Sequence, residues 1–264
     1  MTKINIGDIE INYQEQGSGI PLILIHGLNS DISGWVFVMP ELAKYYRTIA
    51  VDVRGHGESG KPDIPYSIRM FSDDLWNFCQ KLQISEAHIL GLSMGGAIAQ
   101  QFALLHKEMI RSLVLVSTFS YIDGHLKEAF LKLRRSLATG GYPAFFDEVV
   151  KLAFTPQYIR ENPESIATLK EKRIKINSPV AIARATEACL NFNLKDEISR
   201  INLPTLVLSG REDVFTPLHL AEQIHQSIKG SEWKIIDNVG HNLYIEKPKE
   251  MVEAVLEFLK RNYS

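Results

Sequence analysis

The chain has few cysteines and no long apolar run. Its 264 residues include two cysteines, Cys79 and Cys189, which lie in separate predicted helices. We expect both to be small buried hydrophobic residues in a reducing compartment. No segment approaches the roughly 18 consecutive apolar residues that a membrane-spanning helix needs, and residues 1–6 lack the apolar core of a secretion signal. These absences predict a cytoplasmic protein with no membrane partner.

Neither charge sign is in large excess. With 29 basic and 31 acidic residues, the net charge at pH 7 is −2, and the basic residues are scattered along the chain. A nucleic-acid-binding protein would instead carry a concentrated basic patch. The sequence has no cysteine–histidine cluster with the spacing of metal ligands and no glycine-rich phosphate loop. We therefore expect no nucleic-acid partner, no metal and no cofactor, which argues against a metal hydrolase.

Predicted strands and helices alternate along most of the chain, whose length suits one large α/β domain. Residues 4–13 alternate apolar and polar around Gly7-Asp8, which predicts an antiparallel hairpin. Buried strands are predicted at residues 21–25, 48–53, 87–90, 113–117, 205–209 and 233–236. Helices are predicted at residues 34–44, 68–82, 94–106, 217–229 and 248–262. This alternation predicts a mostly parallel sheet with helices on both faces.

The alternation breaks between Ser117 and Ile201. A crossover from one strand to the next through a single helix is much shorter than this segment. The segment has a helical pattern that is interrupted by prolines. We predict a helical cap at residues 119–199, inserted into a core formed by residues 1–118 and 200–264. The cap is expected to cover the edge of the sheet where the parallel strands end. A few of its aromatic residues are expected to line a pocket there.

The segment from Gly91 to Gly96 is the most informative motif. It has the sequence Gly-Leu-Ser-Met-Gly-Gly, follows an apolar strand and opens a helix. Glycines on both sides of Ser93 let the strand and the helix approach closely. The serine hydroxyl then projects above the sheet beside a helix N-terminus. This context indicates a nucleophilic serine rather than an ordinary strand–helix turn.

A nucleophilic serine needs a base, and the base needs a carboxylate that orients it. The predicted strand 205–209 is followed by Glu212-Asp213, and Thr216-Pro217 predicts the N-cap and first turn of the next helix. Of the eight histidines, His241 is the one that lies both downstream of Asp213 and at the carboxyl end of a strand. Ser93, Asp213 and His241 are therefore expected at the same edge of the sheet.

Two backbone N–H groups are needed to hold the negative oxygen that forms when a serine attacks a carbonyl. One is expected from Met94, which follows Ser93 in the chain. The second is expected from Leu28, because His26-Gly27-Leu28 follows the apolar strand 21–25 at its carboxyl end. The side chain of His26 is expected to have a structural role.

These motifs resemble those of the α/β-hydrolase superfamily over essentially the whole chain. The matching residues are His26-Gly27, Asp52-x-Arg54-Gly55-x-Gly57-x-Ser59, Gly91-x-Ser93-x-Gly95-Gly96, Gly210-x-x-Asp213 and Gly240-His241. The resemblance implies an α/β-hydrolase fold and a triad of Ser93, His241 and Asp213, with Asp213 rather than Glu212 as the acid. It also implies a scaffold role for residues 52–59. Within the superfamily, the chain resembles capped carboxylesterases and enol-lactone hydrolases.

The implied function is that of a serine hydrolase that cleaves a small carboxylic ester or lactone through an acyl-enzyme. Haloalkane dehalogenases and epoxide hydrolases are disfavoured because their nucleophile is an aspartate, whereas position 93 is a serine. Because a fold does not determine a function, a non-catalytic ligand-binding protein is also an open alternative. The sequence does not indicate the oligomeric state or the physiological substrate.

A carbon–carbon bond hydrolase of the meta-cleavage type is the nearer alternative. Such enzymes usually carry a tryptophan after the triad histidine and small residues after the first His-Gly, where this chain has Asn242 and Leu28-Asn29. In that case Arg173 or Arg184 of the cap could bind a substrate carboxylate, although solvent exposure is the expected state of both arginines.

Overall fold

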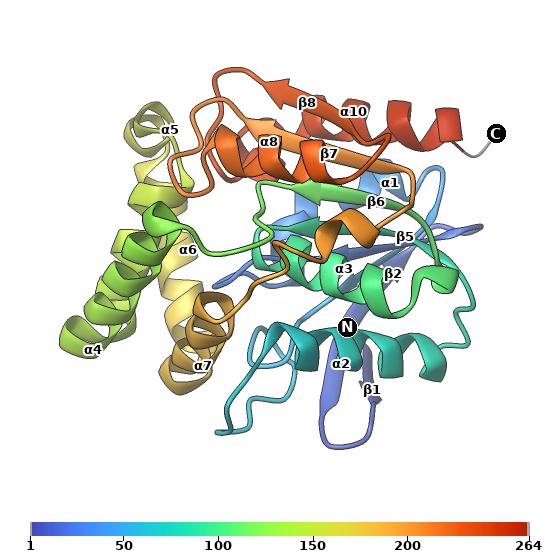
Figure 1. The fold of residues 1–264 in the computed structure, drawn as a ribbon. Coiled ribbons are helices and arrows are strands. Elements are labelled where there is room, and N and C mark those ends of the chain that lie inside the picture. Colours follow the sequence, from blue (N-terminus) through green and yellow to red (C-terminus); the bar gives the residue numbers. More distant parts are fainter. Residues whose placement is uncertain (1, 263–264) are drawn as a thin grey trace.

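The computed structural model describes residues 2–262, which form one eight-stranded sheet surrounded by helices (Figure 1). The strands are β1 (Thr2–Asn5), β2 (Glu10–Gln16), β3 (Pro21–Ile25), β4 (Arg47–Val51), β5 (Ala87–Leu92), β6 (Ile110–Val116), β7 (Thr205–Gly210) and β8 (Glu232–Ile236). Their order across the sheet is β1-β2-β4-β3-β5-β6-β7-β8. β1 and β2 form the predicted hairpin, β2 pairs antiparallel with β4, and the other neighbours are parallel.

The helices that accompany the sheet alternate with the strands as expected. They are α1 (Met39–Leu42), α2 (Ile68–Lys81), α3 (Met94–Leu105), α8 (Leu218–Ser227), α9 (Leu243–Glu246) and α10 (Pro248–Asn262), with short 3₁₀ helices η1 (Ile32–Phe37), η2 (Lys107–Met109) and η3 (Ile198–Arg200). The ends of the predicted core, residue 1 and residues 263–264, lie outside the described residues.

The segment predicted as one helix at residues 34–44 differs from that prediction. It consists of η1 followed by the single-turn helix α1, with Pro40 in the first turn of α1. Proline lacks a backbone N–H and fits the start of a helix, not its interior. The apolar pattern of this segment is therefore divided between two short elements.

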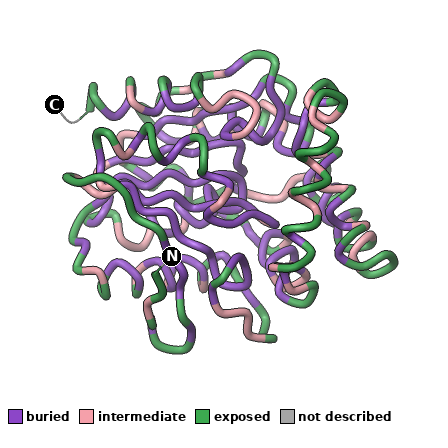
Figure 2. Tube along the Cα trace, turned by 180° about the vertical axis from the view of Figure 1, so that it is seen from behind, coloured by how far each residue is buried: buried purple, intermediate pink, exposed green. Residues whose placement is uncertain are grey.

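The sheet is apolar on both faces, as a parallel sheet covered on both sides must be. In β3, Leu22 and Leu24 belong to a buried cluster with α1 and α10, whereas Ile23 and Ile25 belong to a second cluster with α2 and α3. Successive strand residues point to opposite faces, so one short strand supplies both layers. Figure 2 shows the central strands as almost entirely buried, whereas the edge strands β1 and β8 and the outer turns of the helices carry exposed residues.

Between β6 and β7 the chain forms four further helices at one end of the sheet (Figure 1). They are α4 (Gly124–Ala153), α5 (Pro156–Glu161), α6 (Pro163–Ile176) and α7 (Pro179–Leu190). α4 is kinked at Gly141, which has φ of +66°, a conformation that glycine adopts without a steric penalty. The helical character predicted for residues 119–199 agrees with these elements, whereas the division into core and cap stays a prediction.

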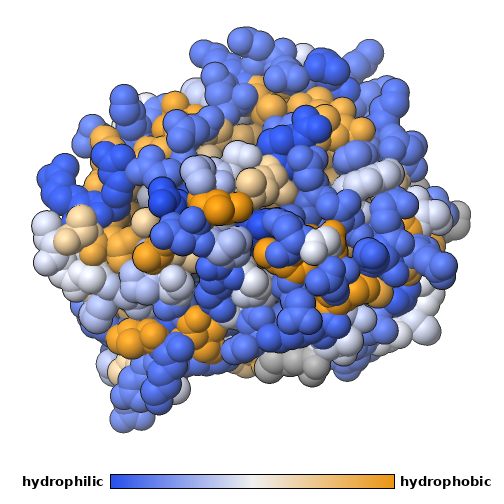
Figure 3. Space-filling model, turned by 90° about the horizontal axis from the view of Figure 1, so that it is seen from below, coloured by the Kyte–Doolittle hydropathy of each residue, from blue (hydrophilic) through white to orange (hydrophobic). Residues whose placement is uncertain are grey.

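The surface mixes hydrophilic and apolar side chains. On the face seen in Figure 3, small apolar groups are separated by hydrophilic residues. Within residues 2–262, no helix combines the length and the apolarity that crossing a membrane would require.

Two histidines are buried in the loops that follow β3 and β4. The rings of His26 and His56 lie 5.3 Å apart, edge to face, and both side chains are almost fully buried. His26 accepts a hydrogen bond from the Val53 N–H at Nε2 and contacts the Gly27 carbonyl through Nδ1. Burial lowers the pKa of His26 to about 4 and that of His56 to about 3. Both rings are therefore neutral at pH 7 and act as structural supports, as expected for His26.

These buried histidines make stability sensitive to mild acid. Their folded-state pKa values lie below the ordinary value of 6.5, so below pH 6.5 the unfolded chain binds protons at these histidines and the folded protein does not. The free energy of unfolding is therefore at its full value above pH 6.5 and decreases as pH falls toward 4. At pH 5 each is expected to cost about 2 kcal/mol of unfolding free energy. Urea unfolding between pH 7.5 and pH 5 measures this loss. His56→Gln should flatten the dependence, whereas replacement of the exposed His125 should leave it unchanged.

Candidate active site

Ser93 lies in a tight turn between β5 and α3. Its backbone has φ of +54° and ψ of −119°, a region that residues with a side chain rarely occupy. A Cβ at Gly91 would lie 2.2 Å from the Gly95 carbonyl oxygen, and one at Gly95 would lie 2.1 Å from the Ile25 carbonyl oxygen. The turn therefore requires both glycines, as the motif predicted.

Hydrogen bonds hold the strained backbone of Ser93 in place. Its N–H donates to the Val116 carbonyl at 2.9 Å. Its own carbonyl accepts from the Thr118 hydroxyl at 2.7 Å and from the Gly96 and Ala97 N–H groups of the first turn of α3. With its backbone anchored on both sides, Ser93 keeps its side chain at the carboxyl edge of the sheet, beside the positive end of the α3 dipole.

Asp213 and His241 meet at the same edge, from the loops that follow β7 and β8. His241 Nδ1 lies 2.9 Å from Asp213 Oδ2, and both side chains are almost completely buried. Asp213 Oδ1 accepts from the N–H groups of Phe215 and Thr216 at 2.9 and 2.8 Å. A carboxylate held on both oxygens fixes the ring orientation of its histidine. Nε2 of His241 is then the basic nitrogen.

Thr216 has a role that differs from its predicted one. The sequence suggested a helix N-cap at Thr216, but α8 begins at Leu218, with Pro217 as its capping residue. The Thr216 hydroxyl instead donates to Asp213 Oδ2 at 2.6 Å and lies 3.1 Å from His241 Nδ1. Aspartate side chains commonly accept from backbone N–H groups two or three residues later, as Asp213 does here, and this local turn brings the Thr216 hydroxyl to the carboxylate.

The structure distinguishes between the two adjacent carboxylates. Glu212 is exposed, whereas Asp213 is 5% exposed and contacts His241. The neighbouring backbone explains the difference, because the Glu212 N–H donates to the Val239 carbonyl while the chain turns at Asp213. Asp213 is therefore the carboxylate that the fold brings to the histidine, and its role as the triad acid stays a prediction.

The loop after β3 lies directly beside Ser93. A turn closed by the Ser30 N–H and the Gly27 carbonyl places Leu28 and Asn29 at its centre. Asn29 has φ of +65°, and asparagine tolerates this left-handed conformation better than most residues with a side chain. A Cβ on Gly27 would lie 3.1 Å from Ser93 Cβ. This close approach brings the backbone at Leu28 next to the serine.

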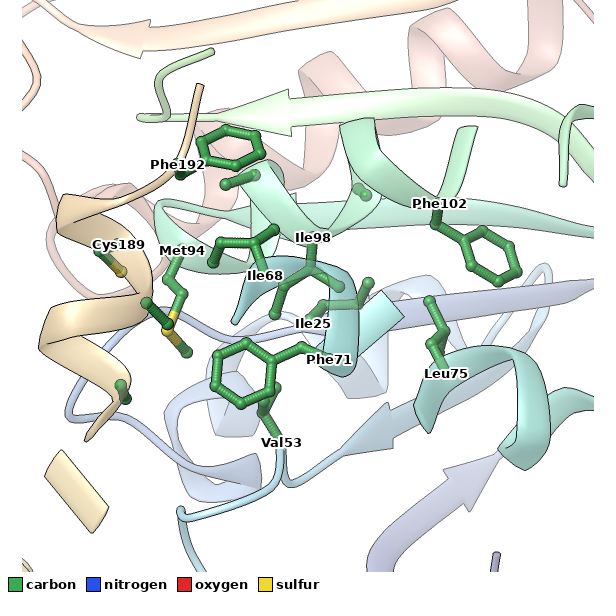
Figure 4. Packing of buried hydrophobic residues seen from close by; sticks show 14 of the residues in the cluster. Ile25, Val53, Ile68, Phe71, Leu75, Met94, Ile98, Phe102, Cys189 and Phe192 are labelled. Carbon is green, nitrogen blue, oxygen red and sulfur yellow. The ribbon is translucent and has the colours of Figure 1, made fainter. Parts of the chain in front are cut away.

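Met94 is the first residue of α3, and its N–H belongs to the free amide groups of a helix N-terminus. Its side chain is buried, and Figure 4 shows it directed toward Cys189 of α7 within the same hydrophobic cluster. The side chain of Met94 therefore contributes to the hydrophobic core, while its N–H belongs to the first turn of α3 next to Ser93.

A cavity of about 250 Å³ opens at this edge, and both Ser93 and His241 line it. Much of its wall is apolar and comes from α4 and α6, with Phe215 from the loop after β7 and Ile245 from α9. Among the aromatic residues of the predicted cap, Phe146 and Phe154 line the cavity. Phe130 and Phe145 belong to the same hydrophobic cluster as these two but are not among the residues that line the cavity. The sequence could not separate these two groups, because all four carry the same helical pattern.

Arg173 of α6 also lines the cavity and is 3% exposed, so the expectation of solvent exposure is wrong for this residue. Its guanidinium forms an ion pair with Asp31, and Nη2 lies 3.4 Å from the Ser30 hydroxyl. Arg184 is partly exposed and pairs with Asp63 at 3.0 Å on the surface. Burial acts to raise the pKa of Asp31, but Arg173 and the Ser33 hydroxyl outweigh it and hold that pKa below its ordinary value.

A second polar contact joins the same loop to the helices above it. Tyr142 of α4 donates to Asn29 Oδ1, and Asn177 Nδ2 donates to the Tyr142 hydroxyl at 2.7 Å. Burial raises the pKa of Tyr142 to about 12, so the phenol stays protonated. Three consecutive loop residues, Asn29, Ser30 and Asp31, are thus tied to α4, α6 and the residue after α6. Sequence reasoning missed this connection.

Residues 52–59 act as a scaffold, as the resemblance implied. The Asp52 carboxylate accepts from the Asn12 side chain and from the Ile32 and Glu58 N–H groups, at 2.7 to 2.8 Å. These bonds join β2, η1 and the loop after β4. In the part of the chain that the structure describes, no group of three or more His, Cys, Asp or Glu side chains is arranged to hold a metal ion.

Comparison with known proteins identifies the family. Residues 20–248 match the family model for the alpha/beta hydrolase fold. Because this match spans most of the chain, the protein belongs to the α/β-hydrolase family. The match and the sheet order confirm the family resemblance and the fold class expected from the sequence.

Relatives of known activity span several substrates. A 2-hydroxy-6-oxo-6-(2'-aminophenyl)hexa-2,4-dienoic acid hydrolase from Metapseudomonas resinovorans is 29% identical, with 98% of this chain and 90% of the relative covered. The enol-lactonase from Burkholderia xenovorans LB400 superposes with a TM-score of 0.92 at 26% identity, covering 98% and 100%. A thermophilic esterase from Thermogutta terrifontis gives a TM-score of 0.88 at 27% identity, covering 97% and 95%. These names confirm the expectation of a hydrolytic enzyme.

Proposed function

We propose that the protein is a serine hydrolase that cleaves a small carboxylic ester or lactone through an acyl-enzyme. The observation that carries the proposal is one cavity lined by Ser93 and His241, with Asp213 bonded to the far side of the histidine ring. Ser93 is the proposed nucleophile, His241 the general base and Asp213 the orienting acid.

In the proposed reaction, His241 Nε2 accepts the Ser93 hydroxyl proton as Oγ attacks the ester carbonyl. The backbone N–H groups of Leu28 and Met94 hold the negative oxygen of the tetrahedral intermediate. The intermediate collapses when the bond to the alkoxy group breaks, and His241 returns the proton to the departing alcohol. A water molecule then gives its proton to His241 and attacks the acyl-enzyme, which releases the carboxylic acid and restores Ser93.

The cavity supports a small substrate. Its volume of about 250 Å³ lies just below the range of roughly 300–1,000 Å³ that is usual for drug-sized ligands, and its apolar wall suits a hydrocarbon acyl or ring portion. The names of the enol-lactonase and the thermophilic esterase favour the same bond types. Residues 119–199 act in this proposal as a cap that closes the cavity and excludes water. A cytoplasmic location and the absence of nucleic-acid and membrane partners stay predictions.

A carbon–carbon bond hydrolase acting on a vinylogous diketone is the second candidate. The relative from Metapseudomonas resinovorans favours it, because its name describes a dienoic acid substrate. Asn242 and Leu28-Asn29 argue against it, since they occupy positions where a tryptophan and small residues are usual in that group. A non-catalytic ligand-binding protein is a remote third candidate, distinguished by stoichiometric binding without turnover.

A substrate panel tests these candidates directly. We expect the highest kcat/KM on short-chain p-nitrophenyl esters or on a small lactone, and a much lower value on a dienone-type diketone. A fluorophosphonate should label the protein once per chain. A diketone that exceeds every ester and lactone in kcat/KM would favour the second candidate. Binding without turnover of any panel member, together with absent labelling, would contradict a serine hydrolase.

A further inference from the structure

Arg173 supplies a positive charge to an otherwise neutral cavity. Among the described side chains that line the cavity, Arg173 is the one that carries a permanent charge. A bound carboxylate would therefore have to use Arg173 as its counter-ion. The state of this arginine thus decides whether the cavity accepts a negative substrate.

The charge of Arg173 is already neutralised inside the protein. Its guanidinium pairs with Asp31, and the two side chains are 4% and 6% exposed. Asp31 cannot easily turn away, because its Oδ1 accepts from the Ser33 N–H at 2.7 Å and caps η1. A buried pair of this kind is held strongly once formed, since separating it would leave two uncompensated charges out of water.

We propose that the Asp31–Arg173 pair makes the cavity select substrates whose acyl group is uncharged, with Asp31 as a specificity-determining residue. This inference rests on the proposed ester or lactone hydrolysis and specifies its substrate class. A carboxylate that enters the cavity loses its hydration and meets an arginine whose charge Asp31 already balances. An apolar group of the same shape loses little and gains contacts with the cavity wall.

Removing the negative partner should reverse this selection. Asp31→Asn keeps the size of the side chain and retains an acceptor oxygen for the Ser33 N–H, but it leaves Arg173 with an unbalanced positive charge. An anionic acyl group then finds a counter-ion in the cavity. The matched control is Asp63→Asn, which removes the same charge from the exposed ion pair with Arg184 on α7.

Two p-nitrophenyl esters of matched shape test the proposal. One carries the 5-methylhexanoyl group, and the other carries the 4-carboxybutanoyl group, in which a carboxylate replaces the terminal isopropyl group. We expect the wild type to prefer the neutral ester in kcat/KM by about 100-fold. Asp31→Asn should reduce this preference at least tenfold by raising kcat/KM on the anionic ester, whereas Asp63→Asn should leave it unchanged.

Binding measured without turnover separates this inference from the proposed function. Calorimetry on the Ser93→Ala variant uses the anilides of the same two acids, and we expect tighter binding of the neutral anilide. Equal binding of both anilides, or wild-type hydrolysis of both esters within tenfold, would overturn the inference. Selective binding of the neutral anilide by a protein that hydrolyses neither ester would contradict the proposed function and support the inference. If Asp31→Asn does not fold, the wild-type comparison and the anilides still decide the question.

Discussion

Ser93→Ala is expected to lower kcat for the best ester substrate by about a million-fold, because removal of a nucleophilic serine has effects of that order. Alanine cannot form the acyl-enzyme. The remaining activity would come from direct attack of water on the bound ester, with the Leu28 and Met94 N–H groups stabilising the negative oxygen that forms. Steady-state kinetics measures the loss, and a fluorophosphonate measures it independently, since the variant should not be labelled. Thermal unfolding checks that the tight turn is intact.

The control for this variant is Ser136→Ala on α4, where the hydroxyl contacts the Leu133 carbonyl outside the cavity. Its kcat/KM should stay within about threefold of the wild type, as is usual for a change away from the site. Labelling that persists in Ser93→Ala, or a comparable loss in Ser136→Ala, would show that the nucleophile lies elsewhere.

Asp213→Asn is expected to lower kcat by about four orders of magnitude while the fold is retained, by analogy with a serine-protease triad. In the structure, Oδ1 accepts from the Phe215 and Thr216 N–H groups. The amide oxygen of asparagine would take this position and direct its NH₂ group toward His241 Nδ1. The histidine would then carry its proton on Nε2 and could not accept the proton of Ser93.

The matched control for the acid is Glu212→Gln, one residue earlier in the chain. Glu212 is exposed, so this change should leave kcat within a few-fold of the wild type, as expected for a surface site. Kinetics on both variants, with unfolding curves to confirm that each is folded, decides between the two carboxylates. A larger loss of kcat in Glu212→Gln than in Asp213→Asn would show that Glu212, not Asp213, is the acid.

The order of the elements and the residues at the sheet edge were predictable because the relevant signals are local. β3 and α10 have the predicted bounds, since a short apolar run and a helical apolar period are both contained in consecutive residues. The glycines around Ser93 likewise specify a tight turn through their own backbone freedom. The segment at residues 34–44 was predicted less well, because its apolar period did not reveal that Pro40 begins a separate helix.

The polar contacts between the loop after β3 and the helices above it could not be predicted in the same way. Arg173 and Asp31 are separated by 142 residues, and a charged residue on a helix is most often exposed. Their pairing depends on how α6 packs over the loop, and no pattern within either segment records that packing. Which aromatic residues of the predicted cap line the cavity depends on the same packing.

The sequence by itself determined the α/β architecture, the family, and the presence of Ser93, Asp213 and His241 at strand ends, because parallel strands bring their carboxyl ends to one edge. The tertiary structure alone decided how Thr216 and the backbone hold Asp213 against His241, and that Asp31 neutralises Arg173 beside the cavity. The physical reason is that hydrophobic period and turn chemistry act between near neighbours, whereas burial and charge pairing act between segments that only the completed fold brings together.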